Sequence, residues 1–192
     1  MMKNFVVVIL TCLWFSLSGQ SSAYKVYSLE ELEKANPDTV YALTLAKQKL
    51  TQLPKDLWKY KNLKELYLDR NRLTNLPDTF DLFDNLEYLN MDRNDLEFVP
   101  LAISRLKSLK KLVITRNQIN VVSGYLFYCP FLEEMDFYDN PIGSVEQEIF
   151  NMKQLKKLDI RGVMLSTKMH NDVKSKLHWA TVLTDPPCKC LD

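Results

Sequence analysis

Residues 63–77, LKELYLDRNRLTNLP, decide the fold because their pattern of apolar residues returns along the chain at a constant interval. Each full copy carries an apolar residue at its first, fourth, sixth, eleventh and fourteenth positions. The copies start at residues 40, 63, 86, 109, 132 and 155, so successive starts are 23 residues apart, and the last copy is incomplete. Repetition at this period predicts a solenoid in which every copy forms one coil and stacked coils share a core.

Each copy opens with a predicted strand. In residues 65–69, ELYLD, polar and apolar residues alternate, which sends the leucines to the inner face of a strand and the others to its outer face. Because consecutive coils run in the same direction, their strands are expected to pair in parallel and form one sheet. The rest of each coil returns on the opposite side, where pairs such as Phe80 and Phe83 are expected to complete the core.

An asparagine recurs at the ninth position of four copies, where the chain bends out of the strand. These residues are Asn71, Asn94, Asn117 and Asn140. A buried bend leaves backbone groups without partners, and a side-chain amide can both donate to and accept from them. We therefore expect an asparagine ladder along the solenoid. Gln48 takes this position in the first coil.

The phrase L-x-x-L-x-L-x-x-N-x-L resembles the leucine-rich repeat family, and the resemblance covers residues 40–165. It implies an α/β fold, a right-handed solenoid of the βα type with a parallel sheet on its concave face. It also implies a function in binding other proteins. Extracellular members in animals and plants commonly carry cysteine-rich caps and glycans, whereas this chain has no N-x-Ser/Thr sequon. This departure favours a bacterial envelope or secreted protein.

The first 23 residues have the pattern of a secretory signal peptide. Lys3 precedes an apolar run over residues 5–17, and small residues follow, with an expected cleavage after Ala23 or, as the near alternative, after Gly19. A transmembrane anchor is the competing interpretation, but the run is shorter than the ~20 residues that cross a bilayer. We therefore expect a secreted, periplasmic or envelope protein without membrane insertion after cleavage.

Charge limits the classes of partner. The chain has 25 basic and 24 acidic residues, and cleavage would remove only Lys3, so the mature net charge is close to zero. Nucleic acid and anionic membranes select strongly basic proteins, and neither is expected here.

Two terminal segments are expected to cap the solenoid, because the end coils would otherwise expose their leucines. Ser28 and Glu31 form a capping box that predicts a short helix ending near Pro37, within an N-terminal cap over residues 24–39. Residues 166–177 predict a helix with Ser166 or Thr167 as its N-cap, and residues 180–183 predict a last strand. Together with the tail they form a C-terminal cap over residues 166–192.

Signs of catalysis are scarce. The four glycines are too far apart to form a phosphate loop, and no hydrolase or zinc-protease motif is present. His170 and His178 are interpreted as two exposed cap residues, so neither enzymatic activity nor a cofactor is expected. Cys188 and Cys190 form a C-x-C tail that could bind a soft metal or form a disulfide, and Cys129 is interpreted as a core thiol.

The outer face of the strands is the predicted binding surface. Exposed aromatic and apolar residues on a polar sheet face need a reason, which suggests a protein partner. The candidates are Tyr67, Tyr88, Asn90, Val113 and Tyr138, with Arg70, Arg93 and Arg116 along one edge. The competing interpretation is that the charges form solvated pairs.

Two further functions stay open. An envelope or assembly component, including one that self-associates, would use the convex aromatics of the fourth coil. These are Tyr125, Phe127, Tyr128 and Phe131. A redox or metal-binding protein would act through the C-x-C tail.

Overall fold

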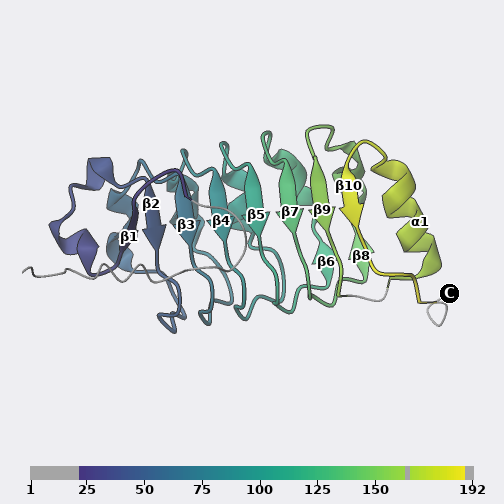
Figure 1. Cartoon of the computed structure of the whole chain (residues 1–192), viewed down its shortest axis with the longest axis horizontal. Helices are drawn as coiled ribbons and strands as arrows, with labels where there is room; N and C mark the ends of the chain where they lie inside the picture. Colours follow the sequence, from purple (N-terminus) through teal and green to yellow (C-terminus); the bar gives the residue numbers. More distant parts are fainter. Residues whose placement is uncertain (1–21, 163–164, 189–192) are drawn as a thin grey trace, which may run out of the picture.

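The computed structural model describes residues 22–162 and 165–188. Most of the expected signal peptide, residues 1–21, and Cys190 lie outside the described residues. The described chain forms an eight-stranded parallel sheet whose strands follow one another in chain order (Figure 1). The strands are β1 Val26–Ser28, β2 Ala42–Thr44, β3 Glu65–Tyr67, β4 Tyr88–Asn90, β5 Lys111–Val113, β7 Glu134–Asp136, β9 Lys157–Asp159 and β10 Thr181–Leu183. The predicted α/β solenoid with one parallel sheet is confirmed.

Residues that pair between neighbouring strands are 23 positions apart, which is the interval of the sequence repeat. Leu43 pairs with Leu66, Leu66 with Leu89, and Leu89 with Leu112. Met135 and Leu158 continue this line, and all six of these side chains are at most 1% exposed. Equivalent residues of successive coils therefore lie side by side, and one continuous core runs through the stack.

The side of the solenoid opposite the sheet consists of single 3-10 turns. These are η3 Lys55–Lys59, η4 Asp78–Leu82, η5 Leu101–Arg105, η6 Gly124–Tyr128 and η7 Gln147–Asn151. A coil of 23 residues leaves only a short return path, and tight i→i+3 turns suit short segments. Phe80 and Phe83, at 0% exposure, fill the space between η4 and the sheet.

Two late coils add a second small sheet, in which β6 (Val121–Val122) pairs in parallel with β8 (Ser144–Val145). The backbone N–H of Glu146 donates to the Val122 carbonyl at 3.1 Å. Pro77 and Pro100 occupy the equivalent position in earlier coils and have no N–H to donate. Loss of the proline therefore allows this extra pairing in the fourth and fifth coils.

The N-terminal cap contains a strand in addition to its short helices. Strand β1 pairs with β2, and its Val26 and Tyr27 are residue types that favour strands. The helical part consists of two 3-10 turns, η1 Glu31–Lys34 and η2 Pro37–Thr39. The capping-box residues do bond reciprocally: Ser28 N donates to Glu31 Oε2 at 2.8 Å, and Glu31 N donates to Ser28 Oγ at 3.4 Å.

The C-terminal cap consists of α1 (Thr167–Lys176) and β10, with the helix beyond the last strands of the sheet (Figure 1). Ser166 is the N-cap and accepts from Met169 N at 3.2 Å. Val173 and Leu177, both 0% exposed, join the core of the last coils. No helix within residues 22–162 and 165–188 is long and apolar enough to cross a membrane.

The four ladder asparagines are 2–8% exposed, and each bonds to the coil before its own. Asn94 Nδ2 donates to the Leu68 carbonyl at 3.0 Å, and its Oδ1 accepts from Leu73 N at 3.0 Å. The same Nδ2 also donates to Met91 O in its own coil at 3.1 Å. Asn71, Asn117 and Asn140 repeat this arrangement with the equivalent backbone groups. The amides therefore join neighbouring coils at the ends of β3, β4, β5 and β7.

Replacing Asn94 with leucine should lower the free energy of unfolding by ~1–3 kcal/mol, because the buried backbone groups of Leu68 and Leu73 lose their partner. Chemical denaturation of the purified variant measures this loss. Asn120→Leu is the matched control, since Asn120 is exposed and the substitution is the same. If both variants unfold like the parent protein, the ladder does not stabilise the fold.

Replacing Leu177 with aspartate should separate α1 from the last coil, because a charge cannot remain in that core, and the protein should then oligomerise or aggregate. Size-exclusion chromatography measures the outcome. Lys174→Asp introduces the same residue at an exposed position of the same helix and should leave the protein monomeric. A monomeric Leu177→Asp variant with an unchanged melting temperature would show that the helix does not protect the core.

Candidate binding surface on the sheet

The outer side chains of β2, β3, β4, β5, β7 and β9 form one continuous surface with the outer side chains that follow each of these strands. This surface is here called the sheet face. Its members come from the first, third and fifth positions of each strand segment. In β3, β5 and β7 the outer residues are partly exposed and the middle one is buried, as the alternation predicts. The sheet face is therefore positioned by the buried leucines beneath it.

Tyr67 and Tyr88 meet at the centre of the N-terminal half of this face. Their strands β3 and β4 are neighbours, and their ring centroids lie 5.2 Å apart at 51°. The Tyr67 hydroxyl donates to Glu65 Oε2 at 2.9 Å. Burial, helped by the charges of Asp69, Glu65 and Asp136, raises the pKa of Tyr88 to about 12. The pair is therefore a half-buried, uncharged aromatic platform at neutral pH.

Two carboxylates, those of Glu65 and Asp69, lie beside Tyr67 on the same face, and a third, Asp136, lies on β7, two strands from Tyr88. Burial raises the pKa of Asp69, and the nearby charge of Asp92 adds to the effect. Burial raises the pKa of Asp136 as well, with a contribution from Asp159. Asp136 Oδ1 accepts only a backbone bond, from Tyr138 N at 3.1 Å. The sheet face thus keeps acidic groups where water solvates them poorly.

Asn90 and Asp92 contribute more to the structure of the face than to its accessible surface. Asn90 is 9% exposed, and its Oδ1 accepts from Asp92 N at 2.9 Å. Asp92 accepts from the Thr115 hydroxyl and from Arg116, whose Nε and terminal nitrogen lie 2.8 and 3.1 Å from its two oxygens. Val113 on β5 pairs with Asn90 on β4, and unlike Asn90 it is partly exposed.

Tyr138 lies apart from the tyrosine pair. It follows β7, which is separated from β4 by β5, so two strand spacings of ~4.8 Å lie between them. Its ring is 41% exposed and stands 5.7 Å from the guanidinium of Arg161. The structure therefore brings together two of the three predicted tyrosines and places the third in a separate, more exposed region.

The edge arginines occupy an unusual backbone position. Arg70, Arg93 and Arg116 have φ of 57°, 54° and 51°, immediately before the ladder asparagines. Left-handed backbone costs an ordinary residue about 1 kcal/mol or more, so the turn imposes this conformation and the side chain does not favour it. Arg93 and Arg116 pair with Asp92 at 3.8 and 2.8 Å. Arg70 forms no ion pair with another described residue, so it is the edge cation most available to a ligand.

Comparison with known proteins agrees with the geometry. A family model described as leucine rich repeat matches residues 38–96. A solved leucine-rich repeat protein of Leptospira interrogans is similar at 29% sequence identity with a TM-score of 0.60. The similarity covers 77% of this chain but 43% of that protein, so the chain spans less than half of its length. No curated protein matches. Residues 38–96 therefore match the leucine-rich repeat family, and the chain is similar in fold to a solved leucine-rich repeat protein.

Members of the leucine-rich repeat family commonly bind proteins and typically have no catalytic activity, which agrees with a sheet face built from tyrosines and charges. Sequence reasoning singled out the tyrosines but overlooked Glu65, Asp69 and Asp136 as a group. The same alternation that marked Tyr67 as outward also marks its neighbours Glu65 and Asp69. What the sequence could not supply was their burial, which depends on side chains from adjacent coils.

The convex aromatics are a second exposed group. Phe127, Tyr128 and Phe131 are 40%, 70% and 59% exposed. Tyr125 differs, because its hydroxyl donates to the Val99 carbonyl and its ring packs against the core. Three of the four predicted residues are therefore accessible, and Tyr125 has a structural partner.

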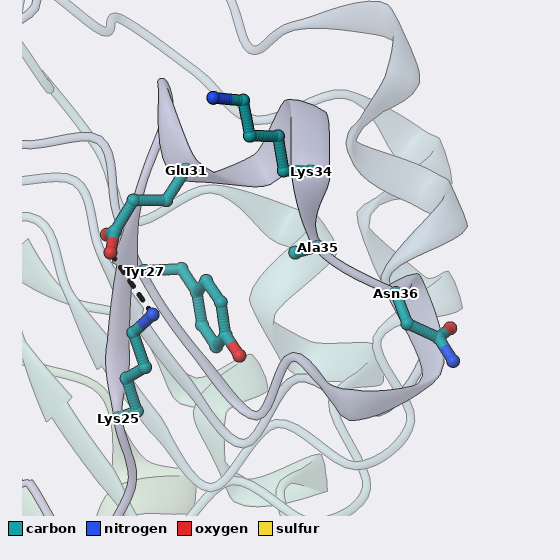
Figure 2. A pocket seen from close by; sticks show the side chains of 6 residues that line it. All are labelled: Lys25, Tyr27, Glu31, Lys34, Ala35 and Asn36. Carbon is teal, nitrogen blue, oxygen red and sulfur yellow. Dashed lines mark ion pairs between the residues drawn. The ribbon is translucent and has the colours of Figure 1, made fainter.

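A hollow of about 360 Å³ lies in the N-terminal cap, lined by Lys25, Tyr27, Glu31, Lys34, Ala35 and Asn36 (Figure 2). The ammonium of Lys25 lies 3.1 Å from Glu31 and 4.2 Å from the Tyr27 ring centroid. Asn36 Oδ1 accepts from Asp38 N at 3.0 Å. Most of the polar groups around the hollow thus hold the cap together.

The cysteines and histidines do not converge on a common site. Cys188 is disulfide-bonded, and a sulfur in a disulfide offers no thiolate to a metal. Cys129 Sγ donates to the Ile103 carbonyl at 3.2 Å, and burial raises its pKa to about 12. His178 is exposed as predicted and contacts the Ser175 carbonyl, but the prediction is wrong for His170, which is 9% exposed because α1 packs against the last coil, and which contacts the Thr184 hydroxyl. Within the part of the chain that the structure describes, no group of His, Cys, Asp and Glu could hold a metal ion.

Replacing Asp69 and Asp136 with asparagine should raise the melting temperature at neutral pH. Because burial raises the pKa of both carboxyls, their favourable contribution is present below the ordinary value of 3.8 and is lost as the pH rises through the folded-state values. The gain over the parent protein should therefore disappear below pH 3.8. Thermal melts followed by circular dichroism test this. A variant that is less stable at neutral pH would contradict the assigned burial.

Proposed function

We propose that this protein is a non-catalytic recognition module that binds a protein partner through the sheet face, with Tyr67 and Tyr88 at the centre of the interface. The observation that carries the proposal is the half-buried tyrosine pair on an otherwise polar sheet, with rings 5.2 Å apart. Tyrosines supply large contact area at little entropic cost and are enriched among residues that dominate binding energy.

The surrounding groups have supporting roles in this proposal. Val113 and Tyr138 extend the contact surface towards the C-terminal half, and Asn90 fixes the backbone beneath it. Arg70, Arg93 and Arg116 line one edge, where charged groups influence the association rate and its salt dependence. No nucleic acid, cofactor or metal is part of the proposed function.

The proposed location is outside the cytoplasm of a bacterium, in the periplasm, the envelope or the medium. The signal-like pattern of residues 1–23 and the absence of sequons support it. Cleavage after Ala23 would leave β1 as the first element of the mature protein.

Replacing Tyr67 and Tyr88 together with alanine should weaken binding of a captured partner by at least ~2 kcal/mol, about thirtyfold in Kd, with little change in stability. The partner is first captured on the immobilised parent protein from bacterial envelope and host extracts, then identified, purified and titrated by calorimetry. Replacement of Arg70 by glutamine should mainly change the association rate and its salt dependence.

The matched control is the double variant Tyr128→Ala with Phe131→Ala, which removes two exposed aromatics from the convex side. It should bind normally. A partner that binds the sheet-face variant normally but no longer binds the convex variant would favour the second candidate function. That function is a structural or assembly component that uses Phe127, Tyr128 and Phe131. The exposure of those three side chains is the observation behind that candidate.

A further inference from the structure

Three carboxylates near Tyr67 and Tyr88 lack the close ion pairs found elsewhere on the sheet face. Cations act on them only at longer range: Arg70 and Lys47 lower the pKa of Asp69, and Lys157 and Lys111 lower that of Asp136. Elsewhere on the face, the acidic groups have cationic partners: Asp159 pairs with Arg161 at 2.7 Å and Glu134 with Lys111 at 3.0 Å. By contrast, Glu65, Asp69 and Asp136 form no ion pair with any described residue. Glu65 accepts from the Tyr67 hydroxyl at 2.9 Å, Asp69 follows Tyr67 on the same face, and the charges of all three carboxylates raise the pKa of Tyr88.

This arrangement is unfavourable in the protein alone. Two of the three carboxylates are largely buried, and burial raises the pKa of each, so ionisation at neutral pH costs stability. A positive charge brought to the face would restore the missing partner for these groups. The unbalanced charge is therefore complementary to a cationic ligand.

The rings add a second attraction for a cation. Lysine and arginine bind favourably over the face of an aromatic ring. The protein uses this contact elsewhere, with Lys25 over Tyr27 at 4.2 Å and Lys153 over Trp179 at 3.4 Å. Among the described residues, no cation of the chain lies over Tyr67 or Tyr88.

We propose that the partner presents a basic protein segment whose lysine or arginine side chain rests on the Tyr67–Tyr88 platform, facing the carboxylates of Glu65, Asp69 and Asp136. The inference rests on the proposed function, because it specifies the partner of the same surface. Arg70 lies at one edge of the sheet face and repels a basic segment there. This repulsion directs the segment towards the tyrosines.

The test compares two double variants with the same change in net charge. Asp69→Asn with Asp136→Asn removes two carboxylates from the sheet face, whereas Asp56→Asn with Asp84→Asn removes two exposed ones from the opposite side of the coils. Each purified variant is titrated with a fluorescent oligo-arginine peptide and, separately, with an oligo-glutamate peptide of equal length. Fluorescence anisotropy gives the dissociation constants.

The sheet-face variant should bind oligo-arginine at least about tenfold more weakly than the parent protein, and the control variant should bind within about twofold of it. Tyr67→Ala with Tyr88→Ala should also weaken oligo-arginine binding. Equal losses in the two aspartate variants would show attraction to overall charge only and would overturn the proposal. Tight binding of oligo-glutamate that requires Arg70 would overturn it too, since the face would then select an acidic partner.

The captured partner separates this inference from the proposed function. If the partner needs Tyr67 and Tyr88 but binds the Asp69→Asn, Asp136→Asn variant with unchanged affinity, the recognition surface stands and the basic segment is wrong. If the partner binds the tyrosine variant normally, both proposals fail. A partner that loses affinity for both variants, with the control unaffected, supports both.

Discussion

The hydrogen bonds that each ladder asparagine makes to the preceding coil are the constraint on which the solenoid depends. A coil of this length cannot enclose its own leucines, so it is stable only when stacked at a fixed register. The amide of Asn94 sets that register, because it donates to Leu68 and accepts from Leu73 at the same time. Backbone groups that would be buried without partners are thereby satisfied at the four bends that carry a ladder asparagine.

This constraint separates the residues that determine the fold from those that are available for binding. The leucines and asparagines are buried and fixed by their neighbours, whereas outer strand residues such as Tyr67 and Val113 are partly exposed. The turn even accepts arginines in left-handed backbone, at Arg70 and its equivalents. The sheet face combines an aromatic pair with poorly solvated carboxylates, which lowers stability at neutral pH while providing charge for recognition.

The periodicity made the sheet, its register and the asparagine positions predictable, because the same residues recur at one interval. Strand β1 was not predicted, since Val26 and Tyr27 precede the first repeat and form a strand only by pairing with β2. The small sheet of β6 and β8 was missed for a related reason, because it depends on an N–H where earlier coils have proline. Alternation identified the tyrosines, but only the packed coils show that Tyr67 and Tyr88 meet while Tyr138 stands apart.

Amide hydrogen exchange tests the central constraint most directly. The backbone N–H groups of Leu73, Leu96 and Ile119 belong to no strand, and each donates to a ladder asparagine of the next coil. The account predicts that these three amides exchange as slowly as those of the central strands, because they open only when neighbouring coils separate. Exchange as fast as that of exposed turn residues such as Lys49 would show that the asparagines do not hold the coils together.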